Sequence, residues 1–78
     1  MFIRVKLYDT LRRLSNTPDR GIWEGDIPDG TNINDLIELI GTREGEVACA
    51  AINKQVVPLD TILQVGDEVM LVTNISGG

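Results

Sequence analysis

The sequence has 78 residues, of which 42% are hydrophobic and 24% charged, with a formal net charge of −5, one cysteine and no histidine. A chain this short forms one domain with a small core; its acidic balance argues against nucleic-acid binding, and its composition excludes an internal disulfide and any site that needs histidine. Its longest apolar runs are far below the roughly 20 residues that span a membrane, and its alternating N-terminus differs from a signal peptide, so we expect a soluble, cytoplasmic protein.

The N-terminal third favours a β-hairpin. Its expected elements are a strand at residues 1–8, a short helical turn at 10–14, a loop at 15–19 and a second strand at 22–27. The first strand rests on a period of two in hydrophobicity, which places Ile3, Val5 and Leu7 on one face. We expect Trp23 to cover the edge of the core.

Residues 32–40 give the clearest helix. Asn32 is a good N-cap, Asp35 falls in the first turn, and Gly41 suits the position after the helix, where positive φ is common. Apolar residues recur at helical spacing and form one face, namely Ile33, Leu36, Ile37 and Ile40.

The C-terminal half alternates strands and turns. The expected strands lie at residues 47–53, 56–57 and 68–75. One helix and a mixed sheet of four or five strands predict a two-layer α+β domain over residues 1–74, followed by a flexible tail at residues 75–78. A single helix covers one face of such a sheet, so the other face looks toward solvent or a partner.

The last strand indicates where a partner would bind. Val69 and Leu71 share one face of this strand, and Met70 and Val72 share the other. We assign Val69 and Leu71 to the core, which leaves Met70 and Val72 as an outward docking patch. A bulge, or a loop folded over the sheet, would cover both faces and is the alternative.

Acidic residues close to the tail in the sequence suggest a basic partner. They are Asp60, Asp67 and Glu68, whereas Arg4, Lys6, Arg12 and Arg13 lie near the N-terminus. An acidic surface beside the tail would speed encounter with a basic partner. A solvated surface that keeps the protein soluble explains the same charges equally well.

The sequence contains no constellation of catalytic residues. Cys49 is the one cysteine and sits among small apolar residues, which favours a packing role over a nucleophile. Asp9, Asp60 and Asp67 are explained by turn chemistry. We therefore expect a protein that is not itself an enzyme and has neither a metal site nor a bound cofactor.

The sequence ends in Ile75-Ser76-Gly77-Gly78. Glycine has no Cβ, so such a tail can lie extended in a narrow channel and bring its backbone close to a nucleotide. A terminal carboxylate presented in this way is suited to be a substrate of another enzyme. A small, inert terminus is the simpler interpretation of the dipeptide alone.

Several segments together resemble the MoaD/ThiS sulfur-carrier family. They are residues 5–14 (VKLYDTLRRL), 30–37 (GTNINDLI), 53–57 (NKQVV), 65–72 (VGDEVMLV) and the tail. The resemblance spans nearly the whole chain and implies the β-grasp (ubiquitin-like) fold. The N-terminal pattern and the loop near residues 15–20 resemble MoaD more than ThiS.

The resemblance implies a mechanism that depends on partner proteins. A ubiquitin-activating-like adenylyltransferase would bind the domain and use ATP to adenylate Gly78, and a sulfur donor would convert the adenylate to a thiocarboxylate. The carrier would then dock on the large subunit of molybdopterin synthase. Gly77 and Gly78 would be the reactive tail, and Ile75, Ser76, Met70 and Val72 would contact partners.

Three alternatives stay open. The chain is a ThiS-like carrier or a carrier for another pathway, a ubiquitin-like protein that modifies lysines, or a binding module with an inert tail. The sequence does not distinguish the pathway or the sulfur donor.

Overall fold

A computed structural model describes residues 1–19, 21–43 and 45–73. The elements in chain order are β1 (Phe2–Leu7), the 3-10 helix η1 (Asp9–Leu14), β2 (Ile22–Asp26), α1 (Ile33–Ile40), β3 (Val47–Ile52), β4 (Gln55–Val57) and β5 (Glu68–Thr73). The expected α+β class is confirmed. Neither helix in the described part of the chain has the length and apolar character needed to cross a bilayer.

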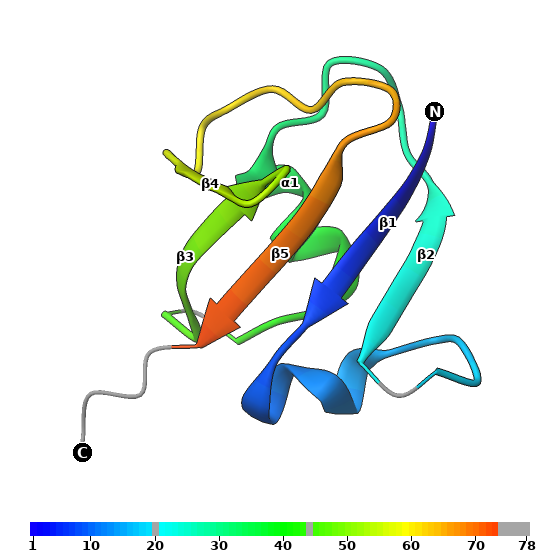
Figure 1. The fold of residues 1–78 in the computed structure, drawn as a ribbon, viewed down its shortest axis with the longest axis vertical. Helices are drawn as coiled ribbons and strands as arrows, with labels where there is room; N and C mark the ends of the chain where they lie inside the picture. Colours follow the sequence, from blue (N-terminus) through cyan, green and yellow to red (C-terminus); the bar gives the residue numbers. More distant parts are fainter. Residues whose placement is uncertain (20, 44, 74–78) are drawn as a thin grey trace.

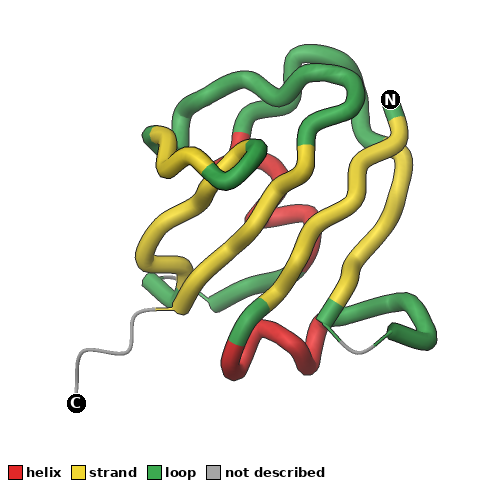
Figure 2. Tube along the Cα trace, viewed as in Figure 1, coloured by secondary structure: helices red, strands yellow, loops and turns green. Residues whose placement is uncertain are grey.

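The five strands form one mixed sheet in the order β2-β1-β5-β3-β4 (Figure 1). β1 and β5 run parallel in the middle of the sheet, and the other neighbours are antiparallel. α1 lies behind the sheet in the view of Figure 2 and covers one face of it. The strand that leads into the tail is therefore the central strand.

Most strands are slightly shorter than the sequence predicts, whereas β4 begins one residue earlier, at Gln55. β2 ends at Asp26, although Ile27 still exchanges two hydrogen bonds with Met1. β3 ends at Ile52 because Asn53 and Lys54 form the turn to β4, both with positive φ. The described part of β5 ends at Thr73, so the predicted continuation to residue 75 lies outside the described residues.

The helix begins and ends where its capping residues predict. The side-chain oxygen of Asn32 accepts a hydrogen bond of 2.8 Å from the backbone N–H of Asp35. Gly41 has a φ of 98°, in the left-handed region that glycine tolerates, and its N–H bonds to the carbonyl of Ile37. These two caps fix α1 to eight residues.

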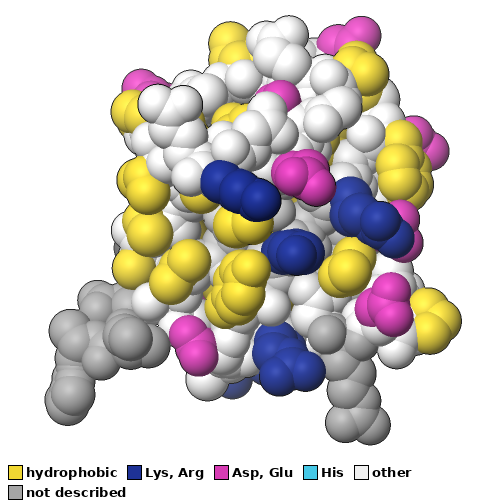
Figure 3. Space-filling model, viewed as in Figure 1, with side chains coloured by type: hydrophobic (Ala, Val, Ile, Leu, Met, Phe, Trp, Pro, Cys, Tyr) yellow, Lys and Arg dark blue, Asp and Glu magenta, His cyan; other side chains and the backbone are white. Residues whose placement is uncertain are grey.

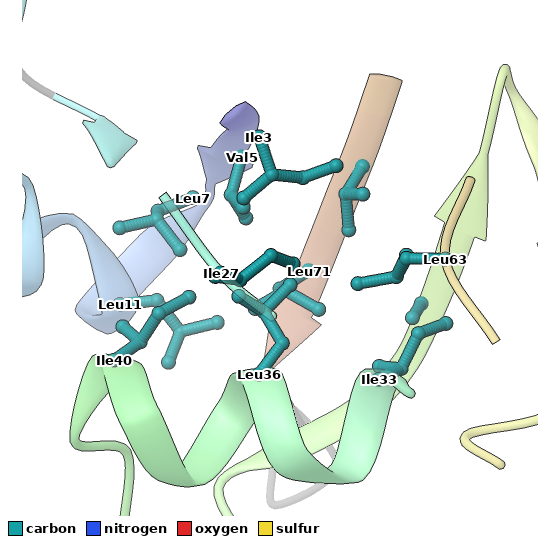
Figure 4. Packing of buried hydrophobic residues seen from close by; sticks show 12 residues of the cluster. Ile3, Val5, Leu7, Leu11, Ile27, Ile33, Leu36, Ile40, Leu63 and Leu71 are labelled. Atoms are coloured by element: carbon teal, nitrogen blue, oxygen red, sulfur yellow. The ribbon is translucent and has the colours of Figure 1, made fainter. Parts of the chain in front are cut away.

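The core lies between α1 and the inner face of the sheet (Figure 4). Its buried members include Ile3, Val5, Leu7, Leu11, Ile27, Ile33, Leu36, Ile40, Ala50, Leu63, Val69 and Leu71. Ile37, predicted on the same helix face, is only partly buried but packs against this cluster. The period of two in β1 and β5 thus places alternate residues inside.

The loop before the edge strand β2 forms hydrogen bonds with the free edge of that strand. The side-chain amide of Asn16 donates to the carbonyl of Glu24 at 2.7 Å and accepts from its N–H at 2.8 Å, as a neighbouring strand would do. Trp23 packs against the core from β2, as expected for a residue that covers the core edge. This loop therefore protects an exposed strand edge from pairing with other chains.

Candidate functional site

The outward face of β5 is the first part of the candidate site. Val69 and Leu71 are buried, at 1% and 0% exposure, which confirms the assignment of these residues to the core. Met70 and Val72 lie on the opposite face and are partly exposed. A sheet uncovered on one side therefore presents both predicted contact residues to solvent, although their neighbours shield part of each.

Small and apolar side chains extend this face beyond β5. On the neighbouring strand β3, Ala51 pairs with Met70 and Cys49 pairs with Val72. On the next strand, Val56 pairs with Ala51 and is 70% exposed. Figure 3 shows hydrophobic side chains gathered on this face next to Lys and Arg side chains. We call these five residues the outer patch: Cys49, Ala51, Val56, Met70 and Val72.

The end of β5 is fixed to the structure by a side-chain hydrogen bond. The hydroxyl of Thr73, which is 6% exposed, donates to a carboxylate oxygen of Asp9 at 3.1 Å. Asp9 has a φ of 54° and begins η1 directly after β1. The point where the tail leaves the domain is thereby tied to a residue 64 positions earlier. The sequence predicts only a turn role for Asp9, because the contact with Thr73 joins opposite ends of the chain.

The tail itself lies outside the described residues. This applies to all four of its predicted site residues, namely Ile75, Ser76, Gly77 and Gly78. Their assigned roles in adenylation and partner contact stay predictions. The structure describes the chain as far as Thr73 of the central strand.

The acidic residues predicted to lie beside the tail are far from Thr73, where the described part of the chain ends. Glu68 is the first residue of β5, and Asp67 precedes it, so the six-residue strand separates them from the end at Thr73 by about 17 Å. Asp60 lies in the loop between β4 and β5, at the end of the sheet opposite to Thr73 (Figure 1). Closeness in sequence failed as a guide because an extended strand carries the chain across the molecule.

Three cations and one carboxylate line a hollow next to the outer patch. The hollow has a volume of about 240 Å³ and is lined by Arg4, Lys6, Ile22, Lys54, Glu68, Val69 and Met70. Arg4 is paired with Glu24 at 3.4 Å. Lys6 lies directly opposite Met70 in the parallel β1–β5 pair. The pairing of β5 with both β1 and β3 brings these residues together from distant parts of the sequence.

A second charged cluster joins η1 to the loop before β3. Glu46 accepts from both terminal nitrogens of Arg13, from the backbone N–H of Arg43 and from the hydroxyl of Thr10. These donors, with the hydrogen bond from Arg13 contributing most, lower the pKa of Glu46 from 4.5 to about 2. The cluster holds the loop closed and has no free carboxylate for catalysis.

A larger hollow lies elsewhere, between α1 and the loop before β3. Its volume is about 640 Å³, and its lining mixes Ile37, Val47 and Leu59 with Asn34 and Glu38. This hollow is on the helix side of the sheet, and nothing in its lining suggests group transfer, so we place the candidate site on the outer face. Within residues 1–19, 21–43 and 45–73, no cluster of Cys, Asp and Glu is arranged to hold a metal ion.

Comparison with known proteins agrees with this fold. The model of the ThiS family matches residues 5–78. The structure is similar to that of SAMP1 from Haloferax volcanii, with a TM-score of 0.71 at 20% identity over 100% of both chains. It is also similar to a chain in a complex of subunits 1 and 2 of molybdopterin-converting factor from Helicobacter pylori 26695, with a TM-score of 0.61 at 19% identity over 100% of both chains. No curated protein sequence matches the chain.

Proposed function

The chain belongs to the ThiS family, a family of ubiquitin-like sulfur carriers with the β-grasp fold, and from this premise we propose that Gly78 is adenylated and then converted to a thiocarboxylate. The observation that carries the proposal is the reach of the family match, which continues through Gly77 to Gly78. The chain would act with partner enzymes and supply no catalytic side chain of its own.

The proposed chemistry proceeds in two balanced steps. A carboxylate oxygen of Gly78 attacks the α-phosphorus of ATP, and the bond to pyrophosphate breaks, which gives an acyl-adenylate. A sulfur donor at the oxidation level of sulfide then attacks the acyl carbon, and AMP leaves. ATP binds to the partner adenylyltransferase, and Ser76 and Gly77 would have to bind there in an extended conformation to place the terminal carboxylate at the nucleotide.

The outer patch supplies the docking surface in this proposal. Met70 and Val72 contact the partner, and Ile75 and Ser76 continue the contact toward its active site. Hydrophobic side chains beside the exit of a tail give a partner a fixed reference from which to position that tail. The Thr73–Asp9 hydrogen bond supports this geometry because it anchors the last described residue.

We further propose that the pathway is molybdopterin synthesis, with the chain as the MoaD-like small subunit of molybdopterin synthase. Two observations support this choice: the MoaD-like N-terminal segment at residues 5–14, and the similarity of the fold to a chain in a molybdopterin-converting factor complex. The large subunit of the synthase would then be the sulfur acceptor.

The direct test is a reconstitution. The pure protein is incubated with ATP, sulfide and the adenylyltransferase encoded in the same genome, alkylated with iodoacetamide, and its C-terminal peptide is weighed by mass spectrometry. Alkylation is needed because exchange of oxygen for sulfur adds nearly the same mass as oxidation of Met70 or Cys49. We expect an alkylated sulfur on Gly78.

A tail variant provides the control. One residue added after Gly78 should abolish adenylation without changing the circular dichroism spectrum. Activation of this extended tail would contradict the mechanism. An unmodified Gly78 in the wild type, with a control carrier active in parallel, would favour an inert binding module, and isopeptide conjugates that vanish on deletion of Gly78 would favour a protein modifier.

A further inference from the structure

The turn between β3 and β4 has an unusual residue at its second position. Ile52 pairs with Gln55, which leaves Asn53 and Lys54 as a two-residue loop. Their φ angles are 52° and 71°. Two-residue hairpin loops with both φ angles positive favour asparagine followed by glycine. Lys54 stands where glycine would be free of backbone strain.

Asn53 has a structural reason for this conformation, whereas Lys54 has none in the described fold. The side chain of Asn53 accepts a hydrogen bond of 3.1 Å from the N–H of Glu68, and its own N–H donates to the Glu68 carbonyl at 2.9 Å. The turn is thus fastened to β5 through Asn53. The ammonium of Lys54 makes no ion pair and no hydrogen bond with any residue that the structure describes.

Lys54 instead lines the hollow beside the outer patch. Lys6 lines the same hollow from β1, and Met70 lies on β5, between β1 and the strand β3 that leads into the Lys54 turn. Glu68 also lines it, and Arg4 on its rim is engaged by Glu24. Among these cations Arg4 is the one paired with a described carboxylate, whereas Lys6 and Lys54 have no ion pair with any residue that the structure describes. The two lysines beside Met70 are therefore available to a partner.

We propose that Lys54 and Lys6 bind carboxylates of the activating enzyme, on either side of an apolar contact to Met70. This inference rests on the proposed function and specifies its partner: an adenylyltransferase whose docking surface is apolar and bordered by Asp or Glu. Lysine at the second turn position supplies a positive charge to this contact, although its positive φ strains the backbone.

Lys54 allows strain and charge to be separated with three variants. K54R keeps the charge and the strain, K54Q keeps the strain and loses the charge, and K54G loses both. A matched charge control is R43Q, because Arg43 is an exposed cation in the loop before β3 and borders the hollow on the helix side. K6Q tests the second cation.

The readouts are the Tm of each variant and the KM for the carrier in ATP–pyrophosphate exchange catalysed by the adenylyltransferase of the same genome. We expect K54G to raise Tm by about 2–5 °C and K54Q to leave it within about 2 °C. Both should raise KM by about 2–4-fold, and the K6Q/K54Q double variant by about 3–10-fold, with kcat little changed. K54R and R43Q should keep the wild-type KM.

Salt provides an independent measurement. The wild-type kcat/KM should fall several-fold between 50 and 500 mM NaCl, and that of K6Q/K54Q should fall less, because screening weakens the same ion pairs that the substitutions remove. If K54Q and K54G leave KM unchanged, or if R43Q raises KM equally, the inference about Lys54 is wrong. The proposed function would still stand in that case, provided that the wild type supports exchange. Absence of exchange with the wild type would overturn both.

Discussion

Leu71 and Val72 are neighbours in the central strand, and truncation of each should affect different properties. Leu71 is fully buried, and Figure 4 shows its side chain beside Ile27 and Leu36, between the sheet and α1. Val72 belongs to the outer patch, on the opposite face of the same strand, and is partly exposed. One residue step therefore separates the core from the docking face.

We expect Leu71→Ala to lower the free energy of unfolding by about 3–4 kcal/mol. Loss of a buried leucine removes transfer free energy and leaves a cavity, which together cost about 2.7–5 kcal/mol, and a position flanked by β1 and β3 has little room to collapse. A domain of 78 residues has a total stability of about 4–12 kcal/mol. The corresponding fall in Tm is about 12–25 °C.

The assay is urea unfolding followed by the fluorescence of Trp23 and by circular dichroism. Val72→Ala is the matched control and should cost less than about 1 kcal/mol, because its side chain is not enclosed. In ATP–pyrophosphate exchange we expect Val72→Ala to raise the KM for the carrier more than Leu71→Ala does. Equal destabilisation by the two substitutions, or a loss below 1 kcal/mol for Leu71→Ala, would refute the assignment of faces in β5.

Three further substitutions test other parts of the fold. Asn16→Ala removes two hydrogen bonds to the backbone of Glu24, and it should cost about 1–3 kcal/mol in urea unfolding and increase concentration-dependent association in light scattering. The pKa of Glu46 is lowered from 4.5 to about 2, so its stabilisation is complete above pH 4.5 and should be lost as the pH falls toward 2; Glu46→Gln should flatten this part of a plot of Tm against pH. A Cβ at Gly25 would lie 2.8 Å from the ring of Trp23, so Gly25→Ala should displace the ring, shift its emission to the red and cost about 1–3 kcal/mol.

The sequence predicts the elements of this fold well because each depends on a local signal. The alternation in β1 and β5 and the helical spacing in α1 correctly identify the buried side chains, and Asn32 and Gly41 mark the helix ends. The ends of the strands are less predictable because they depend on pairing. Ile27 continues the apolar pattern of β2, yet the strand ends one residue earlier.

The candidate site was only half predictable. Met70 and Val72 follow from the period of the strand, but the cations around them come from β1 and from the β3–β4 turn, which are far away in sequence. The acidic residues were misplaced for the converse reason, since Glu68 is near the tail in sequence and at the opposite end of β5 in space. The missed cations and the misplaced carboxylates both depend on how the strands pair and in which direction they run, and local sequence patterns do not contain that information.

The position of β5 explains how one short strand serves both stability and recognition. It lies between β1 and β3, so its backbone is paired on both sides and its end at Thr73 is held by Asp9. A partner that binds the outer patch therefore binds a surface whose position relative to Thr73 is fixed. Rigidity at the base of the tail lowers the entropy that is lost when the terminal carboxylate is positioned for reaction. Loosening of this base by Thr73→Val, which keeps the shape and removes the hydroxyl, should accordingly impair exchange more than it impairs docking.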